Sequence, residues 1–196
     1  MKREVTWKQR EENILLSLKK LDYLNRSQLQ ILHNLGTDRN ASRVLQRMSE
    51  FLSHFKDGEY IYYLNKEGRE RVGATKVLKK TAQARHYIMR NSLFIAYGCP
   101  STWRNEIKLE VPKVVKVIAD ALFQREKRYH IVEVDHTQKM TKNKGKIERY
   151  RKLIESGVFE IPPKFVWITT TELRRKQIMS LSKGLDTQVF MAKDFY

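Results

Sequence analysis

The apolar residues of the first part of the chain recur at helical spacing in three successive segments and then give way to an aromatic, β-branched run. Ser27 precedes the second segment as a predicted N-cap, and Thr37 or Asp38 precedes the third. The predicted elements are helices at Trp7–Leu21, Gln28–Leu35 and about Arg39–Phe55, a turn at 56–59 and a strand at Tyr60–Leu64. This order predicts a small helical domain that ends in a β-hairpin.

Three helices followed by a hairpin is the element order of a winged helix-turn-helix, which we assign to residues 1–75. In that fold the second motif helix lies in the major groove of DNA and the wing can follow the backbone. Arginine recurs every four residues on the third helix, opposite the apolar stripe, and Arg and Asn make bidentate contacts to base edges. The predicted DNA-binding residues are Arg39, Asn40, Ser42, Arg43, Gln46, Arg47, Lys56 and Tyr60.

The charge balance favours a polyanionic partner. The chain has 39 Lys and Arg against 22 Asp and Glu, for a formal net charge of +17. Such a surplus attracts nucleic acid over long range and lets binding draw on counterion release, so double-stranded DNA is the expected partner. The alternatives are a solubilising surface charge, a solvated basic helix face, and a winged helix that serves as a protein–protein module.

The cysteine content and hydropathy bear on the compartment. Cys99 is the single cysteine, which excludes an internal disulfide and a cysteine-rich zinc module. No apolar stretch approaches the about 18 residues that a membrane helix needs, and the first residues lack the apolar core of a signal peptide. We therefore expect a cytoplasmic protein with no membrane partner.

A second domain is predicted over residues 82–196, after a linker at 73–81 that has no apolar period. Its expected strands are Trp103–Glu110, Val114–Phe123, Tyr129–Asp135, Lys164–Thr170 and Gln188–Lys193, and its helices are Gln83–Tyr97, about Thr141–Ser156 and Glu172–Ser182. Helix, three strands, helix, strand, helix, strand describes an α/β mixed sheet with helical crossovers. The whole chain is thus expected to be α+β.

Three carboxylates interrupt the apolar strands of this second domain. Asp120 lies within one strand, and Glu133 and Asp135 bracket Val134 on the next, so that both point to one face. Carboxylates in apolar strands are costly unless they are paired or metal-bound. Together the three side chains would suit Mg²⁺ or Mn²⁺ and phosphodiester hydrolysis. The alternative is a structural remnant whose charges are satisfied by Lys146, Lys108 or Thr137.

Asp120, followed by Glu133-Val-Asp135, resembles the core of the PD-(D/E)XK nuclease superfamily. The family's lysine is missing, because Asp135 stands in its place. Lys146, on the following helix, would supply a relocated cation. The resemblance implies catalytic roles for Asp120, Glu133, Asp135 and Lys146, with the three carboxylates as metal ligands.

A closer likeness is to the replication-relaxation family of bacterial plasmids and mobile elements. Its pattern of a winged helix, an Ala/Pro-Asp strand, an acidic E-x-D strand followed by a threonine, and a K-x-x-x-Y helix is similar to Ala119-Asp120, Glu133-Val-Asp-His-Thr137 and Lys146-Ile-Glu-Arg-Tyr150. This likeness covers nearly the whole chain. It implies a role in replication, mobilisation or their regulation.

The leading hypothesis is a DNA-binding protein, directed by sequence or structure, whose nuclease-like domain is inactive. Binding then needs no cofactor, and the expected partners besides DNA are a second copy of the chain and a replication or relaxosome protein. The main alternative is an endonuclease that uses Mg²⁺ or Mn²⁺ at Asp120, Glu133, Asp135 and Lys146. A transcription regulator of mobile-element genes shares the chemistry of the leading hypothesis and differs in target.

Overall fold

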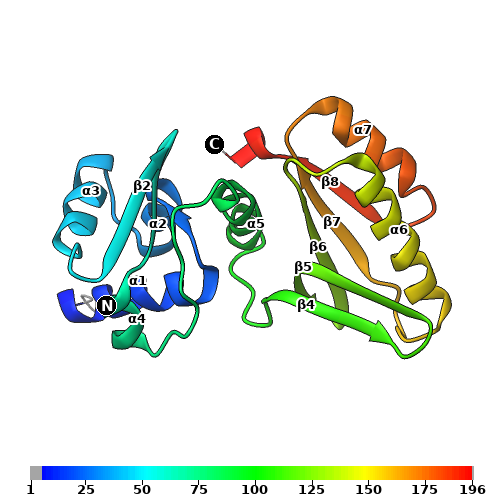
Figure 1. Ribbon diagram of the computed structural model, residues 1–196, viewed down its shortest axis with the longest axis horizontal. Helices are drawn as coiled ribbons and strands as arrows, with labels where there is room; N and C mark the ends of the chain where they lie inside the picture. The colour runs from blue at the N-terminus through cyan, green and yellow to red at the C-terminus, as the bar shows by residue number, and fades with distance from the viewer. Residues whose placement is uncertain (1–5, 196) are drawn as a thin grey trace. The chain divides into compact units, whose positions relative to one another are not determined.

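The computed structural model describes residues 6–195 and divides into two compact units, Met1–Asn91 and Ser92–Tyr196 (Figure 1). The sequence placed the start of the second domain at residue 82. In the structure, the helix α5 (Ala84–Ala96) contributes its first half to the first unit, where Ala84 and Ile88 are buried against Tyr23 and Ile61. The predicted helix at Gln83–Tyr97 therefore forms, but it belongs to both units.

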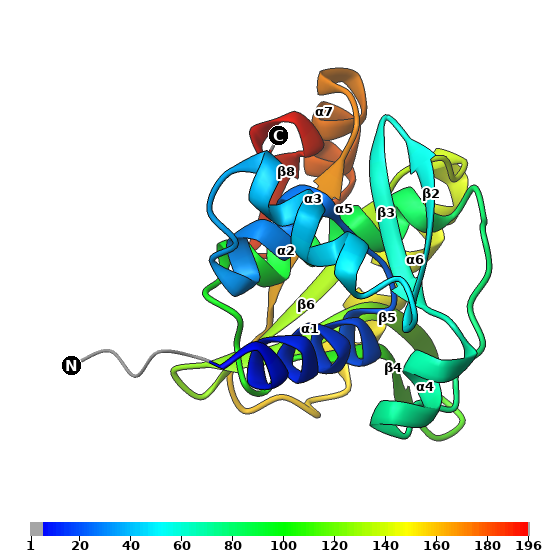
Figure 2. The same ribbon diagram turned by 90° about the vertical axis from the view of Figure 1, so that its left-hand side faces the viewer.

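Within the described residues, the first unit contains four helices, besides the start of α5, and a small antiparallel sheet (Figure 2). Its helices are α1 (Trp7–Leu21), α2 (Arg26–His33), α3 (Asp38–Arg47) and α4 (Lys66–Val72), and its strands, in the spatial order β1-β3-β2, are β1 (Leu24–Asn25), β2 (Leu52–Asp57) and β3 (Glu59–Leu64). α1 forms where it was predicted, because Ile14, Leu15, Leu18 and Leu21 make one buried stripe. The predicted order of three helices and a hairpin is confirmed.

The start of α2 differs from the prediction. Asn25 caps the helix instead of Ser27: its side chain accepts a hydrogen bond from the Gln28 backbone, and the Gln28 side chain accepts one from the Asn25 backbone. This reciprocal capping box satisfies two backbone donors at once, which a cap at Ser27 would not do here. Ser27 instead donates its hydroxyl to Glu59 at 2.7 Å.

The third helix is shorter than predicted. Thr37 caps α3 as expected, but the helix ends at Arg47, and Leu52–Asp57 forms the strand β2. β2 pairs with β3 along its whole length, with Phe55 opposite Ile61 and a turn at Gly58, whose φ of 70° suits glycine. Helical spacing of apolar residues over 48–55 was thus overridden by cross-strand pairing.

The helix α4 is not among the elements predicted from the sequence. The Asn65 side chain caps it by accepting from the Gly68 backbone N–H at 2.9 Å. A Cβ atom at Gly68 would collide with the carbonyl oxygen of Phe51. The glycine is therefore needed for close packing of α4 against the chain before β2.

His33 is a half-buried residue of α2 whose Nε2 atom has no hydrogen-bond partner among the described residues. Burial, and then the charge of Arg10, lower the pKa of His33 to about 4. The ring is accordingly neutral in the folded protein at neutral pH, while in the unfolded chain it takes up a proton near pH 6.5.

We expect this histidine to make stability depend on pH. Its folded pKa is depressed, so its contribution is fully present above pH 6.5 and is lost as the pH falls toward 4. Between pH 7 and pH 5 the free energy of unfolding should fall by about 2 kcal/mol from this residue. Urea unfolding at the two pH values measures it. The variant His33→Gln should lose that much less than the wild type; an equal loss in both proteins would refute the assignment.

The second unit is built on a mixed five-stranded sheet in the order β4-β5-β6-β7-β8. Its elements are β4 (Arg104–Val111), β5 (Val115–Arg125), β6 (Arg128–Asp135), α6 (Met140–Glu155), β7 (Lys164–Thr169), α7 (Glu172–Leu181), β8 (Thr187–Met191) and the 3₁₀ helix η1 (Ala192–Phe195). β4, β5 and β6 are antiparallel, and β7 and β8 continue in parallel with β6. The predicted α+β class, mixed sheet and helical crossovers are confirmed.

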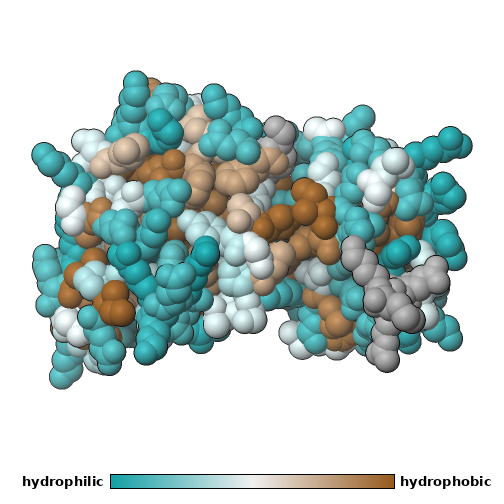
Figure 3. All heavy atoms as spheres, turned by 180° about the vertical axis from the view of Figure 1, so that it is seen from behind, coloured by the Kyte–Doolittle hydropathy of each residue, from teal (hydrophilic) through white to brown (hydrophobic). Residues whose placement is uncertain are grey.

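One face of this sheet is covered by α6 and α7 (Figure 1). Alternate residues of the central strands, such as Ile131, Phe165 and Trp167, pack against Ile147 and other side chains of the two helices. His130, Lys164, Gln188 and Phe190 alternate with these and so lie on the opposite face. No described helix has the length and apolarity to cross a membrane. Figure 3 shows hydrophilic residues over much of one face of the protein, with apolar patches between them.

Candidate functional site

The exposed face of α3 carries most of the predicted DNA-binding residues. Ala41, Val44 and Leu45 are buried and fix which side of the helix points inward. Arg39, Ser42, Arg43 and Gln46 are exposed on the remaining surface. These side chains supply cationic, hydroxyl and amide donors of the kinds that bind phosphates and base edges.

Two predicted residues on α3 are engaged within the first unit. The Asn40 side chain donates to the carbonyl oxygen of Leu35 at 2.7 Å, which holds the segment before the helix. The Arg47 guanidinium lies 3.9 Å from the ring centroid of Trp7, in a cation–π contact with α1. The contact leaves Arg47 exposed but fixes its direction.

The β2–β3 hairpin presents the remaining predicted pair. Lys56 and Tyr60 are exposed and face each other across the two strands. The Tyr60 ring also packs edge-on against His54, with 5.3 Å between centroids, so His54 joins this surface. The sequence analysis missed His54 because it assigned that position to a helix; the alternation of 54 with 56 would have found it in a strand.

Ion pairs hold the hairpin in place within the first unit. At its turn, Arg85 of α5 donates two hydrogen bonds to the Asp57 carboxylate, at 2.8 and 2.6 Å. At the start of β3, Glu59 accepts from the backbone and hydroxyl of Ser27 at the start of α2. The hairpin is therefore tied to both α2 and α5.

Asp120 lies at a fork between two strands of the second unit. The pairing of β5 with β6 runs only as far as Ala121 opposite Val132, while the earlier half of β5 pairs with β4. Beyond that point the Asp120 carboxylate accepts a hydrogen bond from the Val134 backbone N–H at 2.7 Å. The side chain thus replaces a strand–strand hydrogen bond, and the register brings Asp120 beside Glu133.

Glu133 is fully buried, and its two oxygens have different partners. The ammonium of Lys146 contacts Oε2, and the hydroxyl of Tyr150 donates to Oε1. Lys146 also lies 4.0 Å from the Asp120 carboxylate. The structure therefore brings together three of the predicted site residues, Asp120, Glu133 and Lys146. With Tyr150 they form what we call the acidic cluster.

Burial and charge in the acidic cluster favour the protonated form of Glu133. Burial, and then the neighbouring Asp120 carboxylate, raise the pKa of Glu133 well above its usual range. Burial lowers the pKa of Lys146, but the charges of Glu133 and Asp120 outweigh it and raise the pKa. The lysine is thus the resident cation of the cluster.

Asp135 is held in a separate network. The Arg174 guanidinium donates to both of its carboxylate oxygens, at 2.7 and 2.5 Å, and Asn143 and Thr169 donate at 2.7 Å each. Burial raises the pKa of Asp135, but the hydrogen bonds from Arg174, Asn143 and Thr169 outweigh it, and the pKa lies below its usual value. The carboxylate is therefore ionised and fully paired.

The predicted metal site of Asp120, Glu133 and Asp135 is not assembled by this arrangement. Both oxygens of Asp135 accept from Arg174, and the two oxygens of Glu133 contact Lys146 and Tyr150. Within residues 6–195, no three acidic, histidine or cysteine side chains are grouped in a way that could hold a metal ion. As arranged, these residues do not fit Mg²⁺ or Mn²⁺.

Arg174 and Tyr150 are the partners that the sequence analysis did not assign. Arg174 lies in the first turn of α7, where the helix dipole disfavours a cation unless an acid faces it. A cation at this position could therefore have indicated an acidic partner for Arg174. Of the alternative partners considered for the carboxylates, Lys146 is the one observed, while Lys108 pairs with Glu110 on its own strand.

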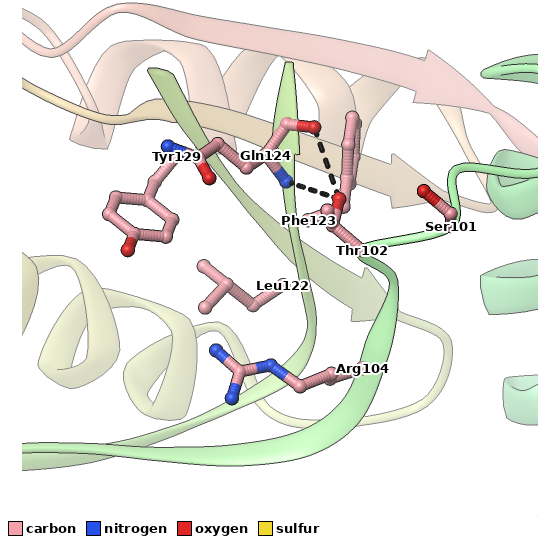
Figure 4. Close-up of a pocket in the computed structure, with 7 residues that line it drawn as sticks. All are labelled: Ser101, Thr102, Arg104, Leu122, Phe123, Gln124 and Tyr129. Carbon is pink, nitrogen blue, oxygen red and sulfur yellow. Dashed lines mark hydrogen bonds between the residues drawn. The ribbon is translucent and has the colours of Figure 1, made fainter. Parts of the chain in front are cut away.

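A pocket of about 270 Å³ near the C-terminal end of β5 contains none of the predicted site residues (Figure 4). Its lining includes Thr102, whose hydroxyl accepts from the Gln124 backbone N–H at 3.0 Å and donates to the Gln124 carbonyl at 3.1 Å. Its groups thus tie the segment before β4 to β5.

The family model described as replication-relaxation matches residues 15–165, from within α1 to the start of β7. The chain belongs to the replication-relaxation family. The match includes both α3 and the acidic cluster of Asp120, Glu133, Lys146 and Tyr150. Membership confirms the resemblance inferred from the sequence and supports a replication-related role on a plasmid or mobile element.

Two solved structures are similar to this family member over most of its length. Protein VC1899 from Vibrio cholerae is 11% identical, with a TM-score of 0.42 over 97% of this chain and 50% of that one. Can2 from Sulfobacillus thermosulfidooxidans, solved in complex with cyclic tetra-adenylate, is 12% identical, with a TM-score of 0.38 over 96% and 52%. The chain spans about half the length of each. Among curated proteins, no sequence matches it significantly.

Proposed function

We propose that this member of the replication-relaxation family is a DNA-binding protein of a plasmid or mobile element. In this proposal it acts in replication, mobilisation or their regulation, and its first unit is a winged helix-turn-helix. The observation that carries the proposal is the face of α3, which exposes Arg39, Ser42, Arg43 and Gln46 together. The net charge of +17 and the family's replication-related role support it.

In the proposed complex α3 enters the major groove. Arg39 and Arg43 contact guanine edges or phosphates, because a guanidinium binds either bidentately. Ser42 and Gln46 add hydrogen bonds to bases. The hairpin acts as the wing, with Lys56 on phosphate and Tyr60 against the backbone. Asn40 and Arg47 orient the helix.

For the second unit we propose a PD-(D/E)XK-like fold whose former catalytic positions have become structural. Lys146 and Arg174 neutralise the buried carboxylates, so that the sheet is stable without a metal ion. In this role the unit contributes phosphate contacts, pairing with a second copy of the chain, or a surface for a replication or relaxosome protein.

A metal-dependent endonuclease is the second candidate. One observation favours it: Asp120, Glu133 and Lys146 meet at the fork between β5 and β6. The separation of Asp135 from these residues and the contact of Lys146 with Glu133 oppose it.

We expect Arg43→Ala to weaken specific DNA binding by about 1–3 kcal/mol, because one bidentate base contact is lost. The target is first selected from a random duplex library with the full chain, and the affinities are then measured by fluorescence anisotropy. Lys66→Ala is the matched control, since Lys66 is an exposed cation on α4 outside the α3 face.

The control should lower affinity slightly and equally for selected and unselected duplexes, as a phosphate contact does. Arg43→Ala should lower it mainly for the selected one. An unchanged affinity in Arg43→Ala, or a loss no greater than that of Lys66→Ala, would remove α3 from the interface.

A further inference from the structure

A groove of about 630 Å³ lies in the second unit, on the sheet face opposite α6 and α7. It runs across the ends of β5, β6, β7 and β8 and reaches the end of α5. This volume is within the range of roughly 300–1,000 Å³ that ligand sites occupy. Neither the predicted DNA-binding residues nor the acidic cluster contribute to it.

Aromatic rings form one wall of the groove. The Tyr97 ring centroid is 6.0 Å from that of His130 and 6.4 Å from that of Phe190, and both contacts are edge-on. Beneath them, His130 stacks on Phe123 with 4.6 Å between centroids. Tyr97 and Phe190 are half-buried, so part of each side chain stays accessible to solvent.

Three cations line the same groove. Arg125 is exposed at the end of β5, and Lys164 begins β7. Arg128 is fixed by an ion pair with Asp186 at 2.7 Å and a hydrogen bond to the Pro162 carbonyl at 2.8 Å. The acid in the lining, Glu126, lies 3.7 Å from Arg125. The lining thus keeps a positive surplus.

This surplus acts on the histidine in the groove. Burial lowers the pKa of His130; a hydrogen bond to the Arg128 carbonyl opposes this, and the charges of Lys164, Arg128 and Arg125 lower the pKa further. The lowered pKa favours the neutral ring at pH 7, so the charge of the groove comes from the three cations.

We propose that this groove binds a short run of single-stranded DNA. Bases stack on the accessible parts of Tyr97 and Phe190, and backbone phosphates lie against Arg125 and Lys164. Single strands are bound by this combination of stacking rings and a basic track, because every base has a flat face. An acidic peptide would use the cations but leave the rings without a partner.

The site is independent of the duplex interface proposed for α3. A chain with both sites would bind paired and unpaired DNA, which suits a replication-related role.

The test uses the full chain and a fluorescent twelve-nucleotide oligothymidylate in low salt, with binding followed by anisotropy. Phe190→Leu removes a stacking ring but keeps an apolar side chain, and Arg125→Ala/Lys164→Ala removes two groove cations. Lys152→Ala/Lys176→Ala is the control, since it removes two exposed cations on α6 and α7. Thermal unfolding verifies that each variant is folded.

We expect Phe190→Leu to weaken oligothymidylate binding about 5- to 100-fold, the loss of one stacked base. The groove double variant should lose at least tenfold, and the control less than threefold. Equal losses in the two double variants, no binding by the wild type, or equally tight groove-dependent binding of polyglutamate would each overturn the proposal. Arg43→Ala should leave this binding unchanged, so failure of the groove and failure of α3 are separable.

Discussion

Replacing Arg174 with alanine is expected to lower the free energy of unfolding by about 3–5 kcal/mol. Its partner Asp135 is fully buried and stays ionised because Arg174 donates to both carboxylate oxygens. Without the guanidinium, Asn143 and Thr169 remain as donors, but no charge compensates the carboxylate. An uncompensated buried charge is among the most costly defects in a protein interior.

The next residue provides the matched control for this experiment. Arg175 is on the same helix and pairs with Glu172 at 3.0 Å, but both side chains are largely exposed. Urea unfolding measures both variants, and Arg175→Ala should lower the free energy of unfolding by less than about 1 kcal/mol. Adding Asp135→Asn to Arg174→Ala should recover part of the loss. If the two arginine variants were equally stable, the Asp135 network would not be structural.

The change Arg90→Met is expected to destabilise the first unit by about 3 kcal/mol or more. The Arg90 side chain is 1% exposed, and it donates to the Leu21 carbonyl at 3.0 Å and the Asp22 carboxylate at 3.3 Å. It thereby caps the last turn of α1 and neutralises a buried acid. Methionine retains the apolar stem and removes these donors.

Lys76→Ala is the matched control for Arg90→Met, because Lys76 also pairs with Asp22 but is not buried. Lys76 contacts the same Asp22 oxygen at 3.1 Å, but its side chain is 46% exposed. Its loss should cost about 1 kcal/mol or less. Thermal or urea unfolding of the two variants measures the difference, and similar losses would show that the buried guanidinium contributes nothing beyond an ordinary surface pair.

The local sequence pattern was sufficient to predict most helices and strands of the second unit. The β-branched residues Ile131, Val132 and Val134 predict a strand, and the helical spacing of Ile147, Tyr150 and Leu153 predicts a helix; the structure agrees with both. In the first unit, Leu52 and Phe55 fit either a helix or a strand. Pairing with β3 decides between them, and pairing across the hairpin is not visible in a helical period.

The candidate site was predictable where residues are near in sequence. Glu133 and Lys146 are joined by one strand and the helix after it, so their meeting followed from the element order. The bond between Asp135 and Arg174 depends on how α7 crosses the sheet, which spacing alone does not give. For that reason Asp135 was grouped with the wrong partners.

The central claim is that the chain binds DNA and that its acidic cluster is structural. A gel shift and a plasmid-cleavage assay on the same DNA, in Mg²⁺ and in Mn²⁺, test both parts with the wild type and Asp120→Ala. We expect a shifted complex and an intact plasmid for both proteins, with thermal unfolding to verify that Asp120→Ala is folded. Cleavage by the wild type that is lost in Asp120→Ala would contradict it and make the second unit a nuclease.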